Sequence, residues 1–171
     1  MKPAELQRID GNRMEYIRLK NDSRYTNVKF NENTGGLLAI HKEHHFDPTV
    51  GRFGIPRGDY ERIAAEVLYS YGRSVVLQSE QLEENEKTPE GLLDGNIFDI
   101  KGVEGRGKTA IKHKLAEASL QGCKTIVLYF HENNTFLLQR IIDGYNHYLR
   151  NSNSKRINTV YYIVDGKLHR L

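Results

Sequence analysis

The dipeptide Asp94-Gly95, set between two short apolar segments, is the local feature that most restricts how this chain can fold. Asp-Gly is a preferred pair for a two-residue type I′ hairpin turn, because both central residues need a positive φ. Counting outward from such a turn places Glu90 directly opposite Asp99. Directly opposed residues share one face of a hairpin, with Cβ atoms roughly 5 Å apart. The sequence therefore predicts two carboxylates side by side.

Lys101 follows Asp99 by two residues and is predicted to lie on the same face, whereas Phe98 and Ile100 point into the core on the other face. Like charges in a directly opposed pair destabilise a purely structural sheet, and a cation between them removes that cost. Two carboxylates and a lysine on one patch can hold a divalent metal ion and position an attacking water. A turn shifted by one residue would remove this pairing, and a solvated hairpin with acids at chance positions is the alternative.

This segment resembles the motif of PD-(D/E)XK nucleases, in which a proline and an acid precede a second acid, a variable residue and a lysine. Pro89-Glu90 stands where the family usually has Pro-Asp, and Asp99-Ile100-Lys101 supplies the second half. The resemblance implies that Glu90 and Asp99 bind a divalent cation, usually Mg²⁺, and that Lys101 activates water or stabilises the phosphorane. Glu61 fits the glutamate that often completes this metal site from the first helix of the core. Its other interpretation is a first-turn acid stabilised by the helix dipole.

Hydrophobic periodicity and turn residues predict an α/β fold with a mixed β-sheet flanked by helices. Strand–helix–strand units after residue 97 favour parallel pairing through right-handed crossovers, and the order of elements matches the PD-(D/E)XK core. Residues 1–57 are expected to form an N-terminal arm, loosely attached over residues 1–24, and a β-hairpin, and residues 58–171 are expected to form the nuclease-like domain. The predicted helices are 59–71, 108–121 and 135–149; the predicted strands are 25–30, 37–41, 74–78, the hairpin around 94–95, 123–130, 160–164 and 167–171, with loops at 79–87 and 151–154.

Composition is that of a globular protein, and charge is unevenly distributed along the chain, although ordinary solvated faces are the alternative interpretation of such charge runs. It has 171 residues, a formal net charge of +3 and one cysteine, which excludes an intramolecular disulfide and fits a reducing compartment. No apolar run approaches the roughly 20 residues of a membrane span, so no membrane association and a cytoplasmic location are expected. Residues 80–94 carry six acids and one lysine, whereas residues 104–124 carry five basic residues and two acids. An acidic lobe beside basic segments suits a metal centre that a nucleic acid approaches.

Three residues are candidates for contacts with the substrate. Lys108 and Lys112 lie one turn apart on a predicted helix and could contact phosphates, although single lysines are more often simply solvated. Gln121 ends the same helix, where the nuclease family often carries a glutamine.

A histidine-rich segment, with His41, His44, His45 and Asp47 within seven residues, precedes the predicted domain. Imidazole is a common metal ligand, but a structural zinc site usually needs four ligands with defined spacings, and none is evident. A polar loop or a lid facing the substrate is therefore the favoured interpretation of this segment.

The wider pattern, from Tyr60-Glu61 through the hairpin to Gln121, also resembles C-terminal nuclease domains of bacterial polymorphic and contact-dependent inhibition toxins, and domains attached to phage head-morphogenesis proteins. This resemblance implies a metal-dependent nuclease acting on RNA (tRNA favoured) or DNA, delivered into the cytoplasm of a target cell and paired with an immunity protein. One alternative is a metal-independent RNase of the barnase/colicin-like group that uses a histidine as acid and base. Another is a non-catalytic module of a phage or mobile element.

Overall fold

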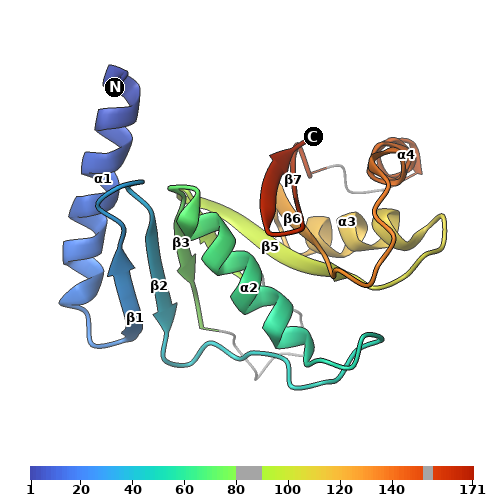
Figure 1. Ribbon diagram of the computed structural model, residues 1–171, viewed down its shortest axis with the longest axis horizontal. Helices are drawn as coiled ribbons and strands as arrows, with labels where there is room; N and C mark the ends of the chain where they lie inside the picture. Colours follow the sequence, from blue (N-terminus) through green and yellow to red (C-terminus); the bar gives the residue numbers. More distant parts are fainter. Residues whose placement is uncertain (80–89, 152–155) are drawn as a thin grey trace.

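One eight-stranded mixed sheet runs through the computed structural model, which describes residues 1–79, 90–151 and 156–171 (Figure 1). The strands lie side by side in sequence order, from β1 to β8. Their bounds are β1 Tyr25–Phe30, β2 Leu37–His41, β3 Ser74–Leu77, β4 Gly91–Leu93, β5 Asn96–Val103, β6 Thr125–Phe130, β7 Thr159–Val164 and β8 Lys167–Arg170. The β2–β3, β5–β6 and β6–β7 pairs are parallel, and the other four pairs are antiparallel. The α/β class and the parallel pairing expected after residue 97 are confirmed.

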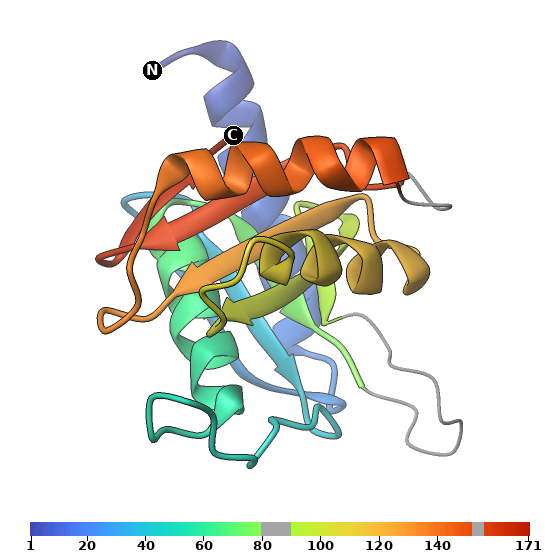
Figure 2. The same cartoon turned by 90° about the vertical axis from the view of Figure 1, so that its right-hand side faces the viewer.

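Helices cover both faces of the sheet (Figures 1 and 2). They are α1 Pro3–Lys20, α2 Arg57–Ser70, α3 Ala110–Leu120 and α4 Leu138–Asn151. Each of the last three connects a parallel strand pair. Helix α2 packs on one face over a core that contains Phe98 and Ile100. Helices α3 and α4 pack on the other face, against Ile126 and Leu128 of β6.

The hairpin of β4 and β5 has the expected register. Gly91 pairs with Phe98, and Leu93 with Asn96. The turn residues Asp94 and Gly95 both have a positive φ, of 49° and 83°, as a type I′ turn requires. Continuing this register past Gly91 places Glu90 opposite Asp99, on the face away from Phe98.

The expectation of a loose arm over residues 1–24 is wrong, because residues 3–20 form α1. The side chains of Ile9 and Leu19 are buried, and Asn12 donates a hydrogen bond to the carbonyl of Gly35. Only a narrow stripe of this helix faces the core, so its apolar residues give no clear period. Most of the loops expected at 79–87 and 151–154, together with Pro89, lie outside the described residues. The domain boundary at residue 57 stays a prediction.

Candidate metal centre and catalytic cavity

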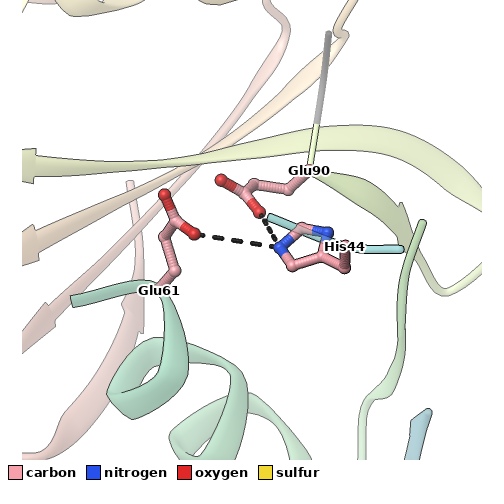
Figure 3. Close-up of side chains that lie close together, drawn as sticks. All are labelled: His44, Glu61 and Glu90. Atoms are coloured by element: carbon pink, nitrogen blue, oxygen red, sulfur yellow. Dashed lines mark ion pairs between the residues drawn. The ribbon is translucent and has the colours of Figure 1, made fainter. Parts of the chain in front are cut away.

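Three side chains from distant parts of the chain meet at one point (Figure 3). His44 comes from the loop after β2, Glu61 from the second turn of α2, and Glu90 from the residue before β4. The Nε2 atom of His44 lies 3.2 Å from Glu90 Oε2 and 3.8 Å from Glu61 Oε2. The other ring nitrogen, Nδ1, is 2.6 Å from the Gln78 carbonyl oxygen, which fixes the orientation of the ring.

The electrostatics of this group favour protonation while no cation is bound. Burial alone would lower the pKa of His44, but the Glu61 and Glu90 carboxylates outweigh it and raise the pKa to about 10. Burial raises the pKa of Glu90 to about 8, with His44 opposing the shift and the Glu61 and Asp99 carboxylates adding to it. Metal ligands must give up such protons, so a cation that enters this group competes with them.

The donor atoms fit a divalent cation. His44, Glu61 and Glu90 each offer one ligand atom, and these atoms lie within 4.8 Å of one another. All three atoms are buried, and none has an assigned hydrogen-bond partner within the described part of the chain. Leaving buried acceptors unpaired is costly, and a shared cation would satisfy them together. These residues could therefore hold a metal ion.

This ligand set differs from the predicted one, which comprised Glu61, Glu90 and Asp99. The side chain of His44 is buried beside the two glutamates, and the interpretation of its segment as a polar loop or lid stays a prediction. The signal was present in the sequence as a cluster of histidines and an aspartate. It could not be assigned, because its glutamate partners lie 17 and 46 residues further along the chain. An imidazole with two carboxylates suits Mn²⁺ or Zn²⁺ better than Mg²⁺, which prefers oxygen ligands.

Asp99 instead pairs closely with Lys101, as the two share one face of β5. Lys101 Nζ lies 2.9 Å from Asp99 Oδ2 and 3.6 Å from Glu117 Oε2 of α3. Burial alone would lower the pKa of Lys101, but the Asp99 carboxylate outweighs it and raises the pKa. Burial raises the pKa of Asp99, and Lys101 opposes that shift. The ammonium group is thus held charged at a fixed place, close enough to the candidate metal ligand Glu90 to interact with it electrostatically.

A cavity of about 430 Å³ brings most of these residues together. Gln121 also lines it, and its buried Oε1 has no hydrogen-bond partner among the described residues. Lys108 and Lys112 do not line it; the backbone of Lys112 faces Gly144 of α4. Lys114, which is also on α3, does line the cavity. The lining residues are His45, Asp47, Arg57, Tyr60, Glu61, Glu90, Asp99, Ile100, Lys101, Gly102, Glu104, Lys114, Glu117 and Gln121.

Comparison with known proteins gives no relative for this arrangement: no family model, curated protein or solved structure matches the chain. Within the described ranges, none of the helices is both long and apolar enough to span a membrane. Any statement about activity therefore depends on the geometry of the cavity.

Proposed function

We propose that this chain is a metal-dependent nuclease that hydrolyses phosphodiester bonds of RNA or DNA. The observation that carries the proposal is the convergence of Glu61, Glu90, Asp99 and Lys101 on one cavity, with His44 behind the two glutamates. These residues come from a loop, a helix and a hairpin. A purely structural sheet has no need to gather buried acids in this way.

The chain's own groups have separable tasks in this proposal. A bound divalent cation would polarise the scissile phosphate and lower the pKa of the attacking water. His44, Glu61 and Glu90 would hold that cation. Lys101 would place a positive charge where negative charge develops on the phosphorus oxygens. Asp99 orients the Lys101 ammonium, and its second oxygen accepts a hydrogen bond from the Ile100 amide, so this carboxylate is itself held in place.

The metal-independent alternative needs a histidine that reaches the substrate. The side chain of His44 has no exposed surface, and one ring nitrogen is committed to the Gln78 carbonyl. This burial argues against His44 as an acid and base. His45, which lines the cavity, is the histidine on which that alternative would depend.

The resemblance to toxin domains extends the proposal. It favours tRNA as the substrate, action in the cytoplasm of a target cell and an immunity protein as the partner. These additions rest on the motif around Glu61, Glu90, Asp99 and Lys101.

The test is incubation with total tRNA and with plasmid, in Mn²⁺, Mg²⁺ or EDTA. We expect cleavage that EDTA abolishes, that Mn²⁺ supports at least as well as Mg²⁺, and that both Asp99→Asn and Lys101→Met remove. Lys112→Met is the matched control, because this lysine lies on the same side of the sheet but outside the cavity. Cleavage that persists in EDTA would favour the metal-independent RNase. No cleavage of either polymer would refute the proposed function.

A further inference from the structure

The side chain of Tyr60 lines the catalytic cavity but leaves its hydroxyl unsatisfied. Tyr60 is 3% exposed, and its hydroxyl oxygen is buried without a hydrogen-bond partner in the part of the chain that the structure describes. A buried hydroxyl without a partner costs roughly 1–3 kcal/mol. Such a group in a cavity wall is a position where a ligand can supply the missing bond.

Two charged residues, Glu104 and Arg57, interact electrostatically with this hydroxyl. Arg57 donates two hydrogen bonds to the Glu104 carboxylate, at 3.3 Å and 3.1 Å. Burial alone would raise the pKa of Glu104, but these bonds outweigh it and lower the pKa, so the carboxylate is ionised. Glu104 is close enough to interact with the Tyr60 hydroxyl, although this hydroxyl has no hydrogen-bond partner among the described residues.

Tyr60 is anchored directly beside the reaction centre. It precedes Glu61 in α2, and its ring packs on Gly102, the residue after Lys101, so closely that a Cβ atom at Gly102 would lie 2.4 Å from Tyr60 Cδ2. Tyr60, Glu104 and two of the candidate metal ligands, Glu61 and Glu90, line the same cavity. A nucleotide with its phosphate at the candidate metal group would therefore place its sugar inside this cavity.

The chemistry of this corner favours a ligand hydroxyl over a second phosphate. A phosphate oxygen could accept a hydrogen bond from Tyr60 but would be repelled by the ionised Glu104. A hydroxyl can accept from the phenol and donate to the carboxylate at the same time. Arg57 offsets the charge of Glu104 and keeps the carboxylate oriented. The pair therefore matches a neutral group that is both donor and acceptor.

We propose that Tyr60 and Glu104 form a subsite for the ribose 2′-hydroxyl, so that the enzyme acts on RNA in preference to DNA. This inference rests on the proposed nuclease function and names its substrate class. The 2′-hydroxyl is the group by which a protein distinguishes RNA from DNA at a given position. A terminal 3′-hydroxyl has the same chemistry, and the experiment must separate the two.

The experiment compares RNA and DNA oligonucleotides of the same single-stranded sequence, each with and without a blocked 3′ end. Cleavage is measured in Mn²⁺, and binding is measured by fluorescence anisotropy with Ca²⁺ as the cation. The variants are Tyr60→Phe, which removes only the hydroxyl, and Glu104→Gln. Tyr129→Phe is the control, because this ring lies 5.4 Å from that of Tyr60 but does not line the cavity. Circular dichroism checks that each variant is folded.

We expect the wild type to prefer blocked RNA over blocked DNA by about tenfold or more, the value of a hydrogen bond to a charged group. Tyr60→Phe and Glu104→Gln should bring that ratio toward one, while Tyr129→Phe keeps the wild-type ratio. A ratio that stays the same in Tyr60→Phe overturns the subsite. An effect confined to unblocked ends overturns the ribose assignment in favour of a terminal hydroxyl.

The binding measurement separates this inference from the proposed function. If neither polymer is cleaved but RNA binds more tightly than DNA in a Tyr60-dependent way, the subsite stands and the hydrolytic function falls. If both polymers are cleaved with equal rates and bind equally, the nuclease stands and the subsite falls. If there is neither cleavage nor RNA-selective binding, both are refuted.

Discussion

Replacing Gly102 with alanine tests the packing that holds the cavity wall together. An alanine Cβ would lie 2.4, 3.0 and 3.1 Å from three carbon atoms of the Tyr60 ring, whereas carbon atoms pack best at roughly 3.5–4.0 Å. The ring cannot easily move, because it packs against Tyr129 at a centroid distance of 5.4 Å. Either α2 or the backbone of β5 must therefore shift.

The expected loss of stability follows from these contacts. Overpacking of this kind costs about 1–3 kcal/mol, and the lower entropy of alanine in the unfolded chain returns about 0.4–1 kcal/mol. With the middle of each range, the net loss is about 1.3 kcal/mol. For a domain of this size, that corresponds to a fall in Tm of roughly 3–5 °C. Because Glu61 follows Tyr60, the variant should also bind Mn²⁺ more weakly than the parent.

Thermal and urea unfolding followed by circular dichroism measure the loss, and isothermal calorimetry measures the Mn²⁺ affinity. Gly107→Ala is the matched control, because a Cβ there meets no atom within 4 Å; its stability should be unchanged or slightly raised. In a Tyr60→Ala background, Gly102→Ala should lose its effect, since the clash is gone. An unchanged Tm for Gly102→Ala, or the same loss in both backgrounds, would refute the reasoning.

Mn²⁺ at 100 times its Kd should stabilise the protein by about 2.7 kcal/mol and raise Tm by roughly 5–11 °C, as measured by differential scanning fluorimetry. Glu61→Gln should reduce this shift. Glu66→Gln, which alters an exposed partner of Lys29, should leave the shift unchanged. Mn²⁺ binding should release protons and should tighten as pH rises from about 6 to about 8. The reason is that the pKa values of His44 and Glu90 are raised to about 10 and about 8, so protons compete with the metal. Calorimetry in buffers of different ionisation enthalpy measures the proton release, and a pH-independent Kd would contradict the prediction. Cys123 is fully buried, and burial raises its pKa to about 12. A thiol reagent should therefore label the native protein only as fast as the core around Cys123 unfolds. Rapid labelling of the folded protein would show that this part of the core is accessible.

The sequence by itself determined the features that depend on neighbouring residues. Asp94-Gly95 specified the turn, the turn specified the register, and the register placed Glu90 opposite Asp99. The alternation along β5 then put Lys101 beside Asp99 and sent Phe98 and Ile100 into the opposite core. These relations follow from backbone geometry over a few residues, so no knowledge of the remaining chain was needed.

Only the tertiary structure decided how distant segments contribute to the cavity. His44 reaches Glu90 because the segment after β2 passes beside the start of β4, a relation that no local period encodes. The packing of α2 on the sheet placed Glu61 beside His44 and Tyr60 against Gly102. The position of α3 brought Lys114 and Gln121 to the cavity and left Lys108 and Lys112 outside it. Periodicity gives the buried face of a helix, but its translation and rotation over the sheet depend on side-chain packing across the whole core, and that packing fixes the composition of the site.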